Sequence, residues 1–462
     1  MKFNFTQGEG IIVQFVFEED SDSKSIYFTG KSGEIFPVNE ENKILVGLGK
    51  KEDFDREQLK SASYKLGRFI GDKEINNIKF SSENVDKLED KNYLFAIIEG
   101  LYLSSYNFDY YKSEKDKFNL ENIYFALNYS NVEELENEVR EFVNLLDSQL
   151  LARDLVNKRS NDIYPETLAK ECVDNLSNKN VTVKVYDKEK IEELGLKAFL
   201  AVARGSENEP KFIIMEYLNG GEEKPLVFVG KGLTYDSGGY SLKPRTGMVS
   251  MKYDMSGAAN VLGMLKTLVD QKKEVNVVAV LALAENMVKG NANRADDVVI
   301  AKNGLSVEIS NTDAEGRLVL GDAVTEAVTY EPVVIMDFAT LTGAVIGALG
   351  ESRTGIFTNQ IEEYKKEKVG EKLWHLPMDE SDEAAVKDTP IADILNSNLR
   401  PFGGASFAAA FINQFTEGYP WLHFDIAGTS QFTKSNPYGP KAASGVMIRT
   451  VVDYILEGSM YD

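Results

Sequence analysis

Residues 1 to about 130 alternate short apolar runs with polar stretches of helical character. Apolar runs at 11–17 and 43–49, rich in valine, isoleucine, leucine and phenylalanine, predict strands. Polar stretches at 52–71 and 91–105 predict helices. This alternation of strands and helices predicts an α/β domain in the first part of the chain.

A strongly charged segment at 130–158 follows this part of the chain. Its apolar residues recur at the spacing of one helix face, which predicts a long amphipathic helix. They include Val139, Phe142, Val143, Leu145, Leu146 and Leu150. We expect the junction between two domains here, with a smaller N-terminal domain at 1–150 and a second domain at 151–462.

Beyond this helix, nearly continuous apolar runs alternate with helical stretches such as 256–271. Runs of this kind predict strands that are buried on both faces, as in a parallel sheet. The predicted strands are 225–230, 275–284, 305–310, 332–337 and 421–427. The fold class that we expect is therefore α/β in both domains. In the second, helices would cover both faces of a mainly parallel central sheet.

Composition narrows the class of protein. A length of 462 residues exceeds one ordinary core, which agrees with two domains. The formal net charge of −22 argues against a large phosphate-binding face, so we expect no nucleic-acid partner. No stretch approaches the roughly 20 apolar residues of a membrane span, and the N-terminus does not resemble a signal peptide. We therefore expect no membrane association and a cytoplasmic location.

The single cysteine and the two histidines limit the chemistry further. One cysteine cannot form an intrachain disulfide, which fits a reducing cytosol, and we interpret Cys172 as a buried apolar residue. With only His375 and His423, zinc sites of two or three histidines are excluded unless both are used, and the motif HExxH is absent. A metal in this chain must therefore be held mainly by oxygen.

Carboxylates and cations gather just after two predicted strands and just before one predicted helix. The strand at 225–230 runs into a loop that contains glycines, and the strand at 305–310 runs into a second polar segment. Ligands of α/β sheets bind beyond the carboxyl ends of the strands, so we expect these side chains to form the site. They are Lys231, Asp236 and Lys243, then Asp254, and then Asp313, Glu315 and Arg317.

Each segment also has an ordinary structural interpretation. Thr312 and Glu315 fit a capping box at the start of a helix. Asp254 fits an acidic residue that is stabilised at a helix N-terminus. A lysine beside a carboxylate usually forms a salt bridge, and the loop at 231–243 does not match the phosphate-binding motif GxxxxGK[ST].

The combination of these segments favours a metal site. Four carboxylates at neighbouring strand ends would repel one another by several kcal/mol, at an effective dielectric of about 20, unless cations neutralise them. Two divalent metal ions would do so. Ligand sets rich in oxygen suit magnesium and manganese, and zinc also accepts carboxylates.

Three sequence blocks resemble the diagnostic blocks of the leucyl aminopeptidase family. They are VGKGLTYDSGGYSLKP at 229–244, MKYDMSGAA at 251–259 and NTDAEGRLVLGDA at 311–323. The resemblance is continuous from about Leu151 to the C-terminus and fainter upstream, where 97–113 still resembles the family's N-terminal domain. It implies a catalytic metallopeptidase domain at 151–462 that binds two divalent metal ions. These ions would be zinc or manganese, or else magnesium.

The resemblance assigns the metal ligands residue by residue. The tighter metal would be held by Lys231, Asp236, Asp254 and Glu315, and the more exchangeable one by Asp236, Asp313 and Glu315. Asp236 and Glu315 would therefore bridge the two ions. A lysine can be a ligand only as a neutral amine, and adjacent dications depress its pKa enough to allow this.

The resemblance also implies the catalytic groups. Lys243 would polarise the scissile carbonyl and stabilise the oxyanion. Arg317 would hold a bicarbonate ion that acts as general base on a water activated by the metals. The substrate's free amine would bind the exchangeable metal, so only N-terminal residues would be removed.

The resemblance further implies the substrate site and the assembly. Met251 and Thr340 match positions that line the side-chain pocket of relatives, and Leu341 and Gly343 match positions beside the substrate backbone. The expected substrates are short peptides with an apolar first residue. The expected assembly is a homohexamer whose active sites face an inner cavity.

The chain departs from the family pattern at 288–296, 401–407 and 441–447, and Glu351 and Ser352 stand where histidines are common. These departures leave the substrate preference and the oligomer contacts open. A narrow dipeptidase, for example one that hydrolyses cysteinyl-glycine, would use the same chemistry with another pocket. A DNA-binding role and a metal-dependent phosphohydrolase are weaker alternatives, since the N-terminal domain is acidic and no phosphate loop is present.

Overall fold

The computed structural model describes residues 1–21, 27–71, 73–80, 90–126, 131–177, 179–360, 367–368 and 371–457. The chain forms two compact units, one of Met1–Leu146 with Phe432–Ala442 and the other of Asp147–Gln431 with Ala443–Asp462. Ser130, the first residue of the predicted helix at 130–158, and the C-terminal residues 458–462 lie outside the described residues.

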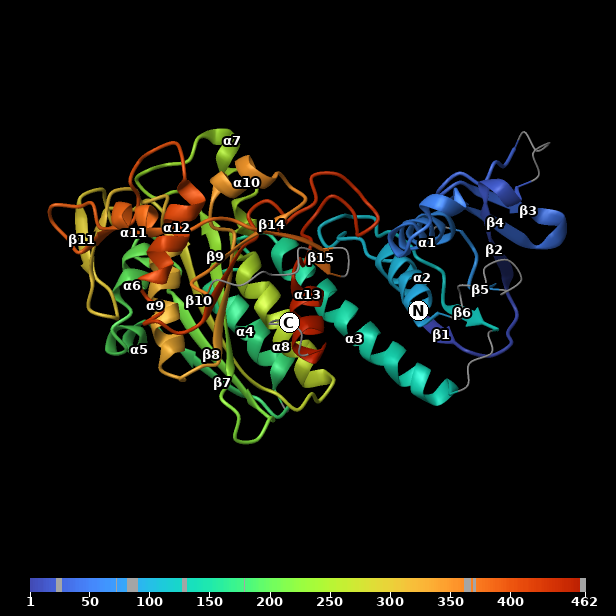
Figure 1. Ribbon diagram of the computed structural model, residues 1–462, viewed down its shortest axis with the longest axis horizontal. Coiled ribbons are helices and arrows are strands. Elements are labelled where there is room, and N and C mark those ends of the chain that lie inside the picture. The colour runs from blue at the N-terminus through green and yellow to red at the C-terminus, as the bar shows by residue number, and fades with distance from the viewer. Residues whose placement is uncertain are drawn as a thin grey trace. The chain divides into compact units, whose positions relative to one another are not determined.

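The N-terminal unit contains a six-stranded sheet in the order β1-β6-β5-β2-β4-β3 (Figure 1). All neighbouring strands are parallel except β3, which is antiparallel to β4. The strands predicted at 11–17 and 43–49 and the helices predicted at 52–71 and 91–105 are confirmed. The elements are β1 (Lys2–Asn4), β2 (Ile11–Phe17), β3 (Ile35–Val38), β4 (Lys43–Gly49), α1 (Arg56–Gly71), β5 (Asn77–Phe80), α2 (Lys91–Ser104) and β6 (Asn122–Phe125).

Helix α3 (Val132–Asn157) confirms the long helix predicted from the apolar spacing. Its first two turns contribute Leu135 and Val139 to the hydrophobic core of the N-terminal unit, together with Leu59 of α1 and Ile97 of α2. Its last turns belong to the second unit, where Leu155 and other residues are buried.

The second unit contains a nine-stranded sheet in the order β15-β16-β14-β18-β13-β9-β10-β8-β7. Its four middle strands, β18, β13, β9 and β10, are parallel, and antiparallel strands flank them on both sides. All eleven residues of β10 are buried, as expected for a strand covered on both faces. The strands are β7 (Thr182–Tyr186), β8 (Lys211–Leu218), β9 (Leu226–Asp236), β10 (Asn276–Asn286), β13 (Val334–Ala339), β14 (Thr354–Thr358), β15 (Glu367–Lys368), β16 (Glu371–His375) and β18 (Trp421–Asp425).

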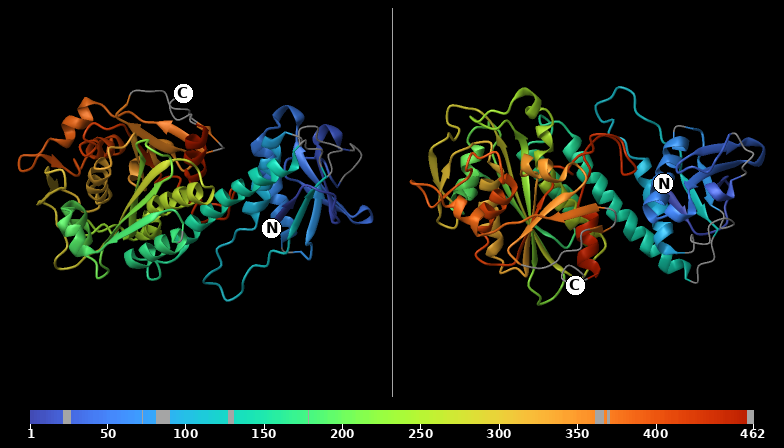
Figure 2. Two further views of the ribbon diagram at one scale, coloured as in Figure 1. Left: turned by 90° about the horizontal axis from the view of Figure 1, so that it is seen from below. Right: turned by 45° about the horizontal axis from the view of Figure 1, so that its top comes forward.

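Helices cover both faces of this sheet (Figures 1 and 2). One layer packs the apolar sides of α6, α9 and α12 against Val229, Val280 and Ile335 of the strands. The opposite layer contains α4, α8 and α13. The predicted fold class is therefore confirmed. The helices are α4 (Pro165–Leu176), α5 (Lys188–Glu193), α6 (Lys197–Ala203), α7 (Arg245–Met248), α8 (Ser256–Asp270), α9 (Gly316–Val328), α10 (Gly343–Leu349), α11 (Glu380–Val386), α12 (Gly404–Asn413) and α13 (Ile448–Glu457).

One predicted strand lies outside the main sheet. The segment at 305–310 forms β12 (Ser306–Ile309), which pairs with β11 (Asp297–Ile300) and β17 (Ile394–Leu395) in a separate three-stranded sheet. Its place in the main sheet was therefore predicted wrongly. In β12 the half-buried Ser306 and Glu308 alternate with the buried Val307 and Ile309, a pattern of burial on one face only.

Two further expectations from the sequence concern the single cysteine and membrane-spanning helices. Cys172 on α4 is fully buried, and burial raises the pKa of its thiol to about 12, which confirms its interpretation as an apolar residue. Among the residues described here, no helix is long and apolar enough to cross a membrane.

Candidate metal centre

The first strand end is shaped by a glycine turn. β9 ends at Asp236, and Gly238 and Gly239 follow with φ of 86° and 61°, a left-handed conformation that glycine adopts without strain. The amide of Gly238 donates to Oδ1 of Asp236 over 2.9 Å, and the amide of Lys243 donates to the carbonyl of Ser237 over 3.0 Å. The turn therefore returns the chain so that Lys243 lies beside Asp236.

Lys231 lies inside the cluster rather than at its edge. Its side chain is 2% exposed, and β9 carries it to the level where the neighbouring strand β13 ends. Its Nζ lies 2.7 Å from Oδ1 of Asp254, 3.1 Å from Oε1 of Glu315 and 3.0 Å from the carbonyl of Thr340. The hydroxyl of Thr340 also donates to Asp254 over 2.8 Å. One buried cation thus connects four separate segments of the chain.

Asp254 lies just before a helix, as its structural interpretation expected, but that interpretation does not account for its side-chain contacts. Asp254 lies in a short 3₁₀ helix, Met251–Met255, that precedes α8. Its Oδ1 accepts hydrogen bonds from Lys231 and Thr340, and its Oδ2 has no hydrogen-bond partner among the described residues. The carboxylate therefore points into the cluster.

The capping box of Thr312 and Glu315 is also absent. Helix α9 begins at Gly316 with Glu315 as its N-cap residue, and no side chain caps it. The hydroxyl of Thr312 instead donates to the carbonyl of Gly238 over 2.7 Å and accepts from the amide of Ser241 over 2.7 Å. Thr312 therefore joins the loop before α9 to the turn after β9.

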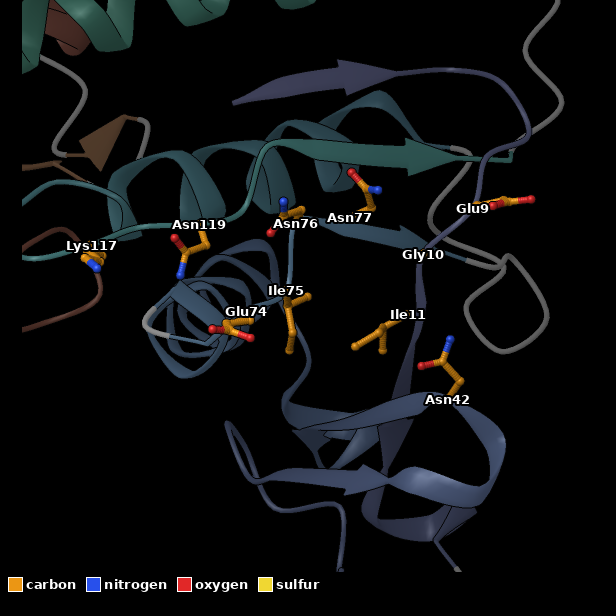
Figure 3. Close-up of a pocket in the computed structure, with 10 residues that line it drawn as sticks. All are labelled: Glu9, Gly10, Ile11, Asn42, Glu74, Ile75, Asn76, Asn77, Lys117 and Asn119. Atoms are coloured by element: carbon orange, nitrogen blue, oxygen red, sulfur yellow. The ribbon is translucent and has the colours of Figure 1, made fainter.

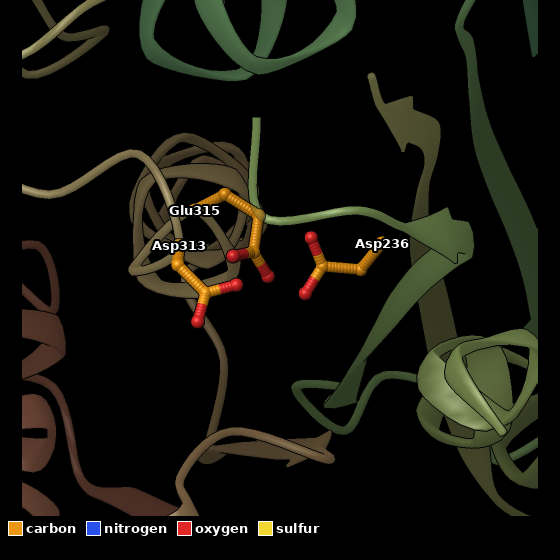
Figure 4. Close-up of side chains that lie close together, drawn as sticks. All are labelled: Asp236, Asp313 and Glu315. Carbon is orange, nitrogen blue, oxygen red and sulfur yellow. The ribbon is translucent and has the colours of Figure 1, made fainter. Parts of the chain in front are cut away.

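Three carboxylates converge in the space that these loops enclose (Figure 4). Asp236, Asp313 and Glu315 each offer an oxygen within 4.8 Å of the oxygens of the other two. Figure 4 shows Asp236 approaching from the end of β9, with Asp313 and Glu315 opposite it on the segment before α9. Lys243 Nζ lies 2.8 Å from Oδ2 of Asp236 and 2.6 Å from Oδ1 of Asp313.

The electrostatics of the cluster favour additional positive charge. Burial and the nearby Asp236 raise the pKa of Glu315 well above its ordinary value. Burial, opposed by Lys231 and reinforced by Asp236, raises the pKa of Asp254 in the same direction. Burial tends to lower the pKa values of Lys231 and Lys243, but the surrounding carboxylates raise both above the ordinary value. Four carboxylates share two lysines here, so negative charge is in excess.

Unpartnered oxygens indicate where that positive charge would bind. Oδ2 of Asp254 and Oε2 of Glu315 are buried and have no hydrogen-bond partner among the described residues. A buried carboxylate oxygen without a partner is costly unless a cation or a donor satisfies it. Hard oxygen ligands at this spacing fit divalent metal ions, so the residues present suit such a centre.

Arg317 lies on the first turn of α9, beside the cluster. Its Nη1 donates to the carbonyl of Asn396 over 2.8 Å, and its guanidinium carbon lies 5.6 Å from the ring centroid of Phe407. Burial lowers the pKa of its guanidinium to about 10. Its Nε makes no hydrogen bond to any described residue, so this group retains a donor.

The four residues expected at the substrate site differ in position. Thr340 contacts Lys231 and Asp254 directly. Leu341 and Lys231 both approach Gly316. A Cβ built on this glycine would lie 3.1 Å from Cδ1 of Leu341 and 2.7 Å from Cε of Lys231. Met251 and Gly343 begin the 3₁₀ helix of Asp254 and helix α10, respectively.

Two buried asparagines at the site were not predicted from the sequence. Asn286, the last residue of β10, donates to Oδ1 of Asp236 over 2.8 Å and to the carbonyl of Thr312 over 3.0 Å. The rule that ligands lie beyond strand ends could have found it, because it follows the apolar run at 275–284. Asn396 follows β17, which has only two residues, so no hydrophobic run marks it.

The two histidines lie apart from the cluster. His423 is buried on β18, where its Nδ1 lies 2.6 Å from Oδ1 of Asp337 on the neighbouring strand. His375 is the last residue of the strand β16. Within the described residues, the side chains that converge on the centre are therefore oxygen ligands and lysines, as the scarcity of histidine predicts.

A cavity of about 840 Å³ lies elsewhere, in the N-terminal unit (Figure 3). Its lining includes Ile11 and Asn77, the first residues of β2 and β5, with several asparagines around them. It therefore lies at the amino ends of parallel strands, whereas ligands of α/β sheets bind at the carboxyl ends. The carboxylate cluster is the stronger candidate for the functional site.

Comparison with known proteins gives one consistent result. The catalytic-domain model of the cytosol aminopeptidase family matches residues 150–452, and the family's N-terminal-domain model matches residues 23–115. The chain is 37% identical to a probable cytosol aminopeptidase of Treponema denticola, with 98% of each chain covered. It is 40% identical to a probable cytosol aminopeptidase of Clostridium perfringens, over 93% of this chain and 90% of the relative.

Solved structures agree with these relatives. A mutant of tomato leucine aminopeptidase superposes with a TM-score of 0.84 at 30% identity, covering 98% of this chain and 96% of the other. A bottromycin maturation enzyme in complex with manganese superposes with a TM-score of 0.85 at 28% identity, covering 98% and 100%. With both family domains matched along nearly its whole length, the chain belongs to the cytosol aminopeptidase family and is a metallopeptidase of the leucine aminopeptidase type.

Proposed function

We propose that this aminopeptidase releases leucine and other apolar N-terminal residues from short peptides, with two divalent metal ions in its active site. The observation that supports this most directly is the convergence of Asp236, Asp313 and Glu315 within 4.8 Å. The metals that suit these ligands are zinc or manganese, with magnesium as a further option. The neighbour with manganese bound is consistent with this choice.

The proposed ligand sets are those that the resemblance to the leucyl aminopeptidase family implies. Lys231, Asp236, Asp254 and Glu315 would hold the tighter ion, and Asp236, Asp313 and Glu315 the more exchangeable one. The partial exposure of Asp313, whose side chain is 32% exposed, supports placing the exchangeable ion on its side. Lys231 would have to lose its proton to serve as a ligand, which adjacent dications favour.

The chemistry divides between the metals and two cationic side chains. When bound, the two ions would lower the pKa of a water molecule and polarise the scissile carbonyl. Lys243, which reaches the cluster from the glycine turn, would stabilise the negative charge that develops on the carbonyl oxygen. Arg317, which retains a donor at Nε, would hold a bicarbonate ion as the general base.

Recognition of the substrate rests on its free amine and its first side chain. The amine would be held at the more exchangeable position, which restricts cleavage to the first peptide bond. Met251 and Thr340 would line the pocket for the first side chain. Leu341 and Gly343 would lie along the substrate backbone, where the exposed start of α10 leaves open space around Gly343.

Three further proposals concern the whole protein. The division into an N-terminal domain at 1–150 and a catalytic domain at 151–462 is supported by the separate family models that match 23–115 and 150–452. A cytoplasmic location is supported by the names of the relatives. A homohexamer would restrict access to short peptides. Its support is the family membership of the chain.

A substrate panel tests the proposed activity. Purified protein supplied in turn with manganese, zinc and magnesium would be assayed on Leu-Gly-Gly, Ala-Gly-Gly, Glu-Gly-Gly and Cys-Gly. The proposal predicts the highest kcat/KM on the leucyl peptide. Hydrolysis of cysteinyl-glycine alone would instead establish the narrow dipeptidase, and no release of any N-terminal residue with any metal would refute the proposal.

A further inference from the structure

The loop that presents Asp313 has no regular secondary structure of its own. It follows β12 and ends at Glu315, where α9 begins. The backbone groups of such a loop must find partners elsewhere, because buried amides and carbonyls are rarely left unpaired. A single residue, Asn396, supplies most of the hydrogen-bond partners for the backbone groups of Ser310, Asn311 and Ala314.

Asn396 is fully buried and reaches this loop from the end of β17. Its own amide donates to the carbonyl of Glu308 over 2.9 Å, which continues the pairing of β17 with β12. The register of two strands therefore fixes where the side chain of Asn396 is presented. This explains how a two-residue strand can direct a side chain into the loop beside it.

The amide side chain of Asn396 uses both of its ends. Its Oδ1 accepts from the amides of Ser310 and Asn311 over 2.9 and 3.2 Å. Its Nδ2 donates to the carbonyls of Asn311 and Ala314 over 2.7 and 3.1 Å. An amide offers two donors and one acceptor oxygen, so this pattern matches asparagine and does not match aspartate, which has no donor when ionised.

The main chain of Asn396 holds a second group of the site. Its carbonyl accepts from Nη1 of Arg317 over 2.8 Å. The same residue therefore clamps both sides of Asp313, at Asn311 and at Ala314, and orients the guanidinium that follows one turn later. The contacts with Ala314 and Arg317 are buried, and those with Ser310 and Asn311 are partly buried, so water has little access to replace them.

We propose that Asn396 is a positioning residue of the active site, which sets the Asp313 carboxylate for the more exchangeable metal and orients Arg317. The inference rests on the proposed function, since it assumes that Asp313 is a ligand. Asn396 itself makes no contact with a metal or a substrate in this account. Loss of such outer contacts typically costs about 10- to 100-fold in metal affinity or activity.

The test compares Asn396→Asp with Asn396→Ser. The first variant keeps the size and the acceptor oxygen but removes both donors, and it brings a second oxygen against two carbonyls. The second variant is smaller and uncharged, and provides an alternative if the aspartate variant does not fold. Asn276→Asp is the matched control. Asn276 is also buried and clamps a loop, accepting from Gly220 over 2.7 Å and donating to Gly221 over 3.1 Å, but it does so at the amino end of β10.

Three measurements are made on each protein. Manganese binding to chelator-treated protein is monitored through the electron paramagnetic resonance signal of free manganese. The other two are kcat and KM for a leucyl peptide at saturating manganese, and the midpoint of thermal unfolding. We expect both Asn396 variants to bind the weaker manganese ion about 10- to 100-fold less tightly and to lose a similar factor in kcat. KM should change less than kcat. Asn276→Asp should lower the unfolding midpoint and leave manganese binding and kcat within about twofold of wild type.

Two results would overturn the inference. One is a folded Asn396 variant with wild-type manganese binding and wild-type kcat. The other is an equal loss of manganese binding in Asn276→Asp, since the effect would then be general destabilisation. A wild-type protein that binds no manganese and releases no leucine would overturn the proposed function itself, and the inference with it.

Discussion

The ammonium group of Lys243 lies 2.6 Å from Oδ1 of Asp313, although the two residues belong to segments separated by α8 and β10. The glycine turn after β9 and the loop before α9 therefore deliver opposite charges to one point. This relationship places Lys243 where it can neutralise ligand carboxylates or act on a substrate held beside them.

The first prediction concerns this lysine. Lys243→Ala should leave the fold intact and lower kcat by about 10² to 10³, the usual cost of losing one oxyanion contact. Lys266→Ala is the control, because Lys266 pairs with Asp270 at the C-terminal end of α8, whereas Asp254 precedes the N-terminal end of that helix. Steady-state kinetics on a leucyl peptide decide. If kcat of the Lys243 variant stays within a fewfold of wild type, this lysine has no role in the mechanism.

The second prediction concerns the glycine that begins α9. A Cβ at Gly316 would lie 2.7 Å from Cε of Lys231, so Gly316→Ala must displace the lysine although alanine favours helices. A displacement near 1 Å at a reacting group can cost about 10²-fold, and we expect a loss of kcat/KM of roughly that order. Gly347→Ala in α10 is the matched control, because nothing lies within 4 Å of its new Cβ. That variant should keep its activity and gain about 0.5–1 kcal/mol in the free energy of unfolding.

The third prediction concerns metal binding and stability. Buried carboxylates in excess of the lysines repel one another, so divalent ions should bind the folded protein far better than the unfolded chain. At 100 times its dissociation constant, a ligand of this kind adds about 2.7 kcal/mol to the free energy of unfolding. Thermal unfolding with and without manganese should show a higher midpoint with the metal. The same midpoint in both conditions, or a shift that persists in Asp236→Ala, would contradict the proposed ligand set.

The fourth prediction uses the single cysteine. Burial raises the pKa of the Cys172 thiol to about 12, whereas an unfolded cysteine titrates near 8.5. At pH 8.5 the folded chain therefore holds the thiol proton and the unfolded chain loses about half of it, so rising pH favours unfolding from there upward. Iodoacetamide at pH 8.5 should leave the folded protein unmodified and label it after denaturation, as mass spectrometry would show. Rapid labelling of the folded protein would contradict the burial of Cys172.

The fifth prediction concerns assembly. Sedimentation velocity at micromolar concentration should give a single species of six chains. The hexamer is proposed from family membership, whereas the chemistry is proposed from the metal centre. A stable monomer with full activity would therefore refute the hexamer and leave the chemistry of the metal centre unchanged.

Much of the fold and of the carboxylate cluster could be predicted from the sequence for one physical reason. Strands buried on both faces appear as continuous apolar runs, and the residues after them lie at one edge of the sheet. Lys231 and Asp236 are expected together on that ground, and the structure brings them together with Asp254 and Glu315.

The features that were missed depend on tertiary pairing. The apolar run at 305–310 has the same length as the runs at 225–230 and 332–337, and only the pairing of β12 with β11 and β17 places it in a separate sheet. Thr312 has the local pattern of a helix cap, but its hydroxyl pairs with Gly238, 74 residues away in the sequence. Asn396 bonds to a loop about 85 residues earlier, and no local pattern indicates such a contact.

The most direct test of the account compares Leu-Gly-Gly with N-acetyl-Leu-Gly-Gly. Protein treated with a chelator, then supplied with manganese, would be assayed for release of the first residue from both peptides. The account predicts rapid release of leucine from the free peptide, no cleavage of the acetylated one, and no activity before manganese is added. Equal cleavage of both peptides, or full activity in the chelator-treated protein, would contradict it.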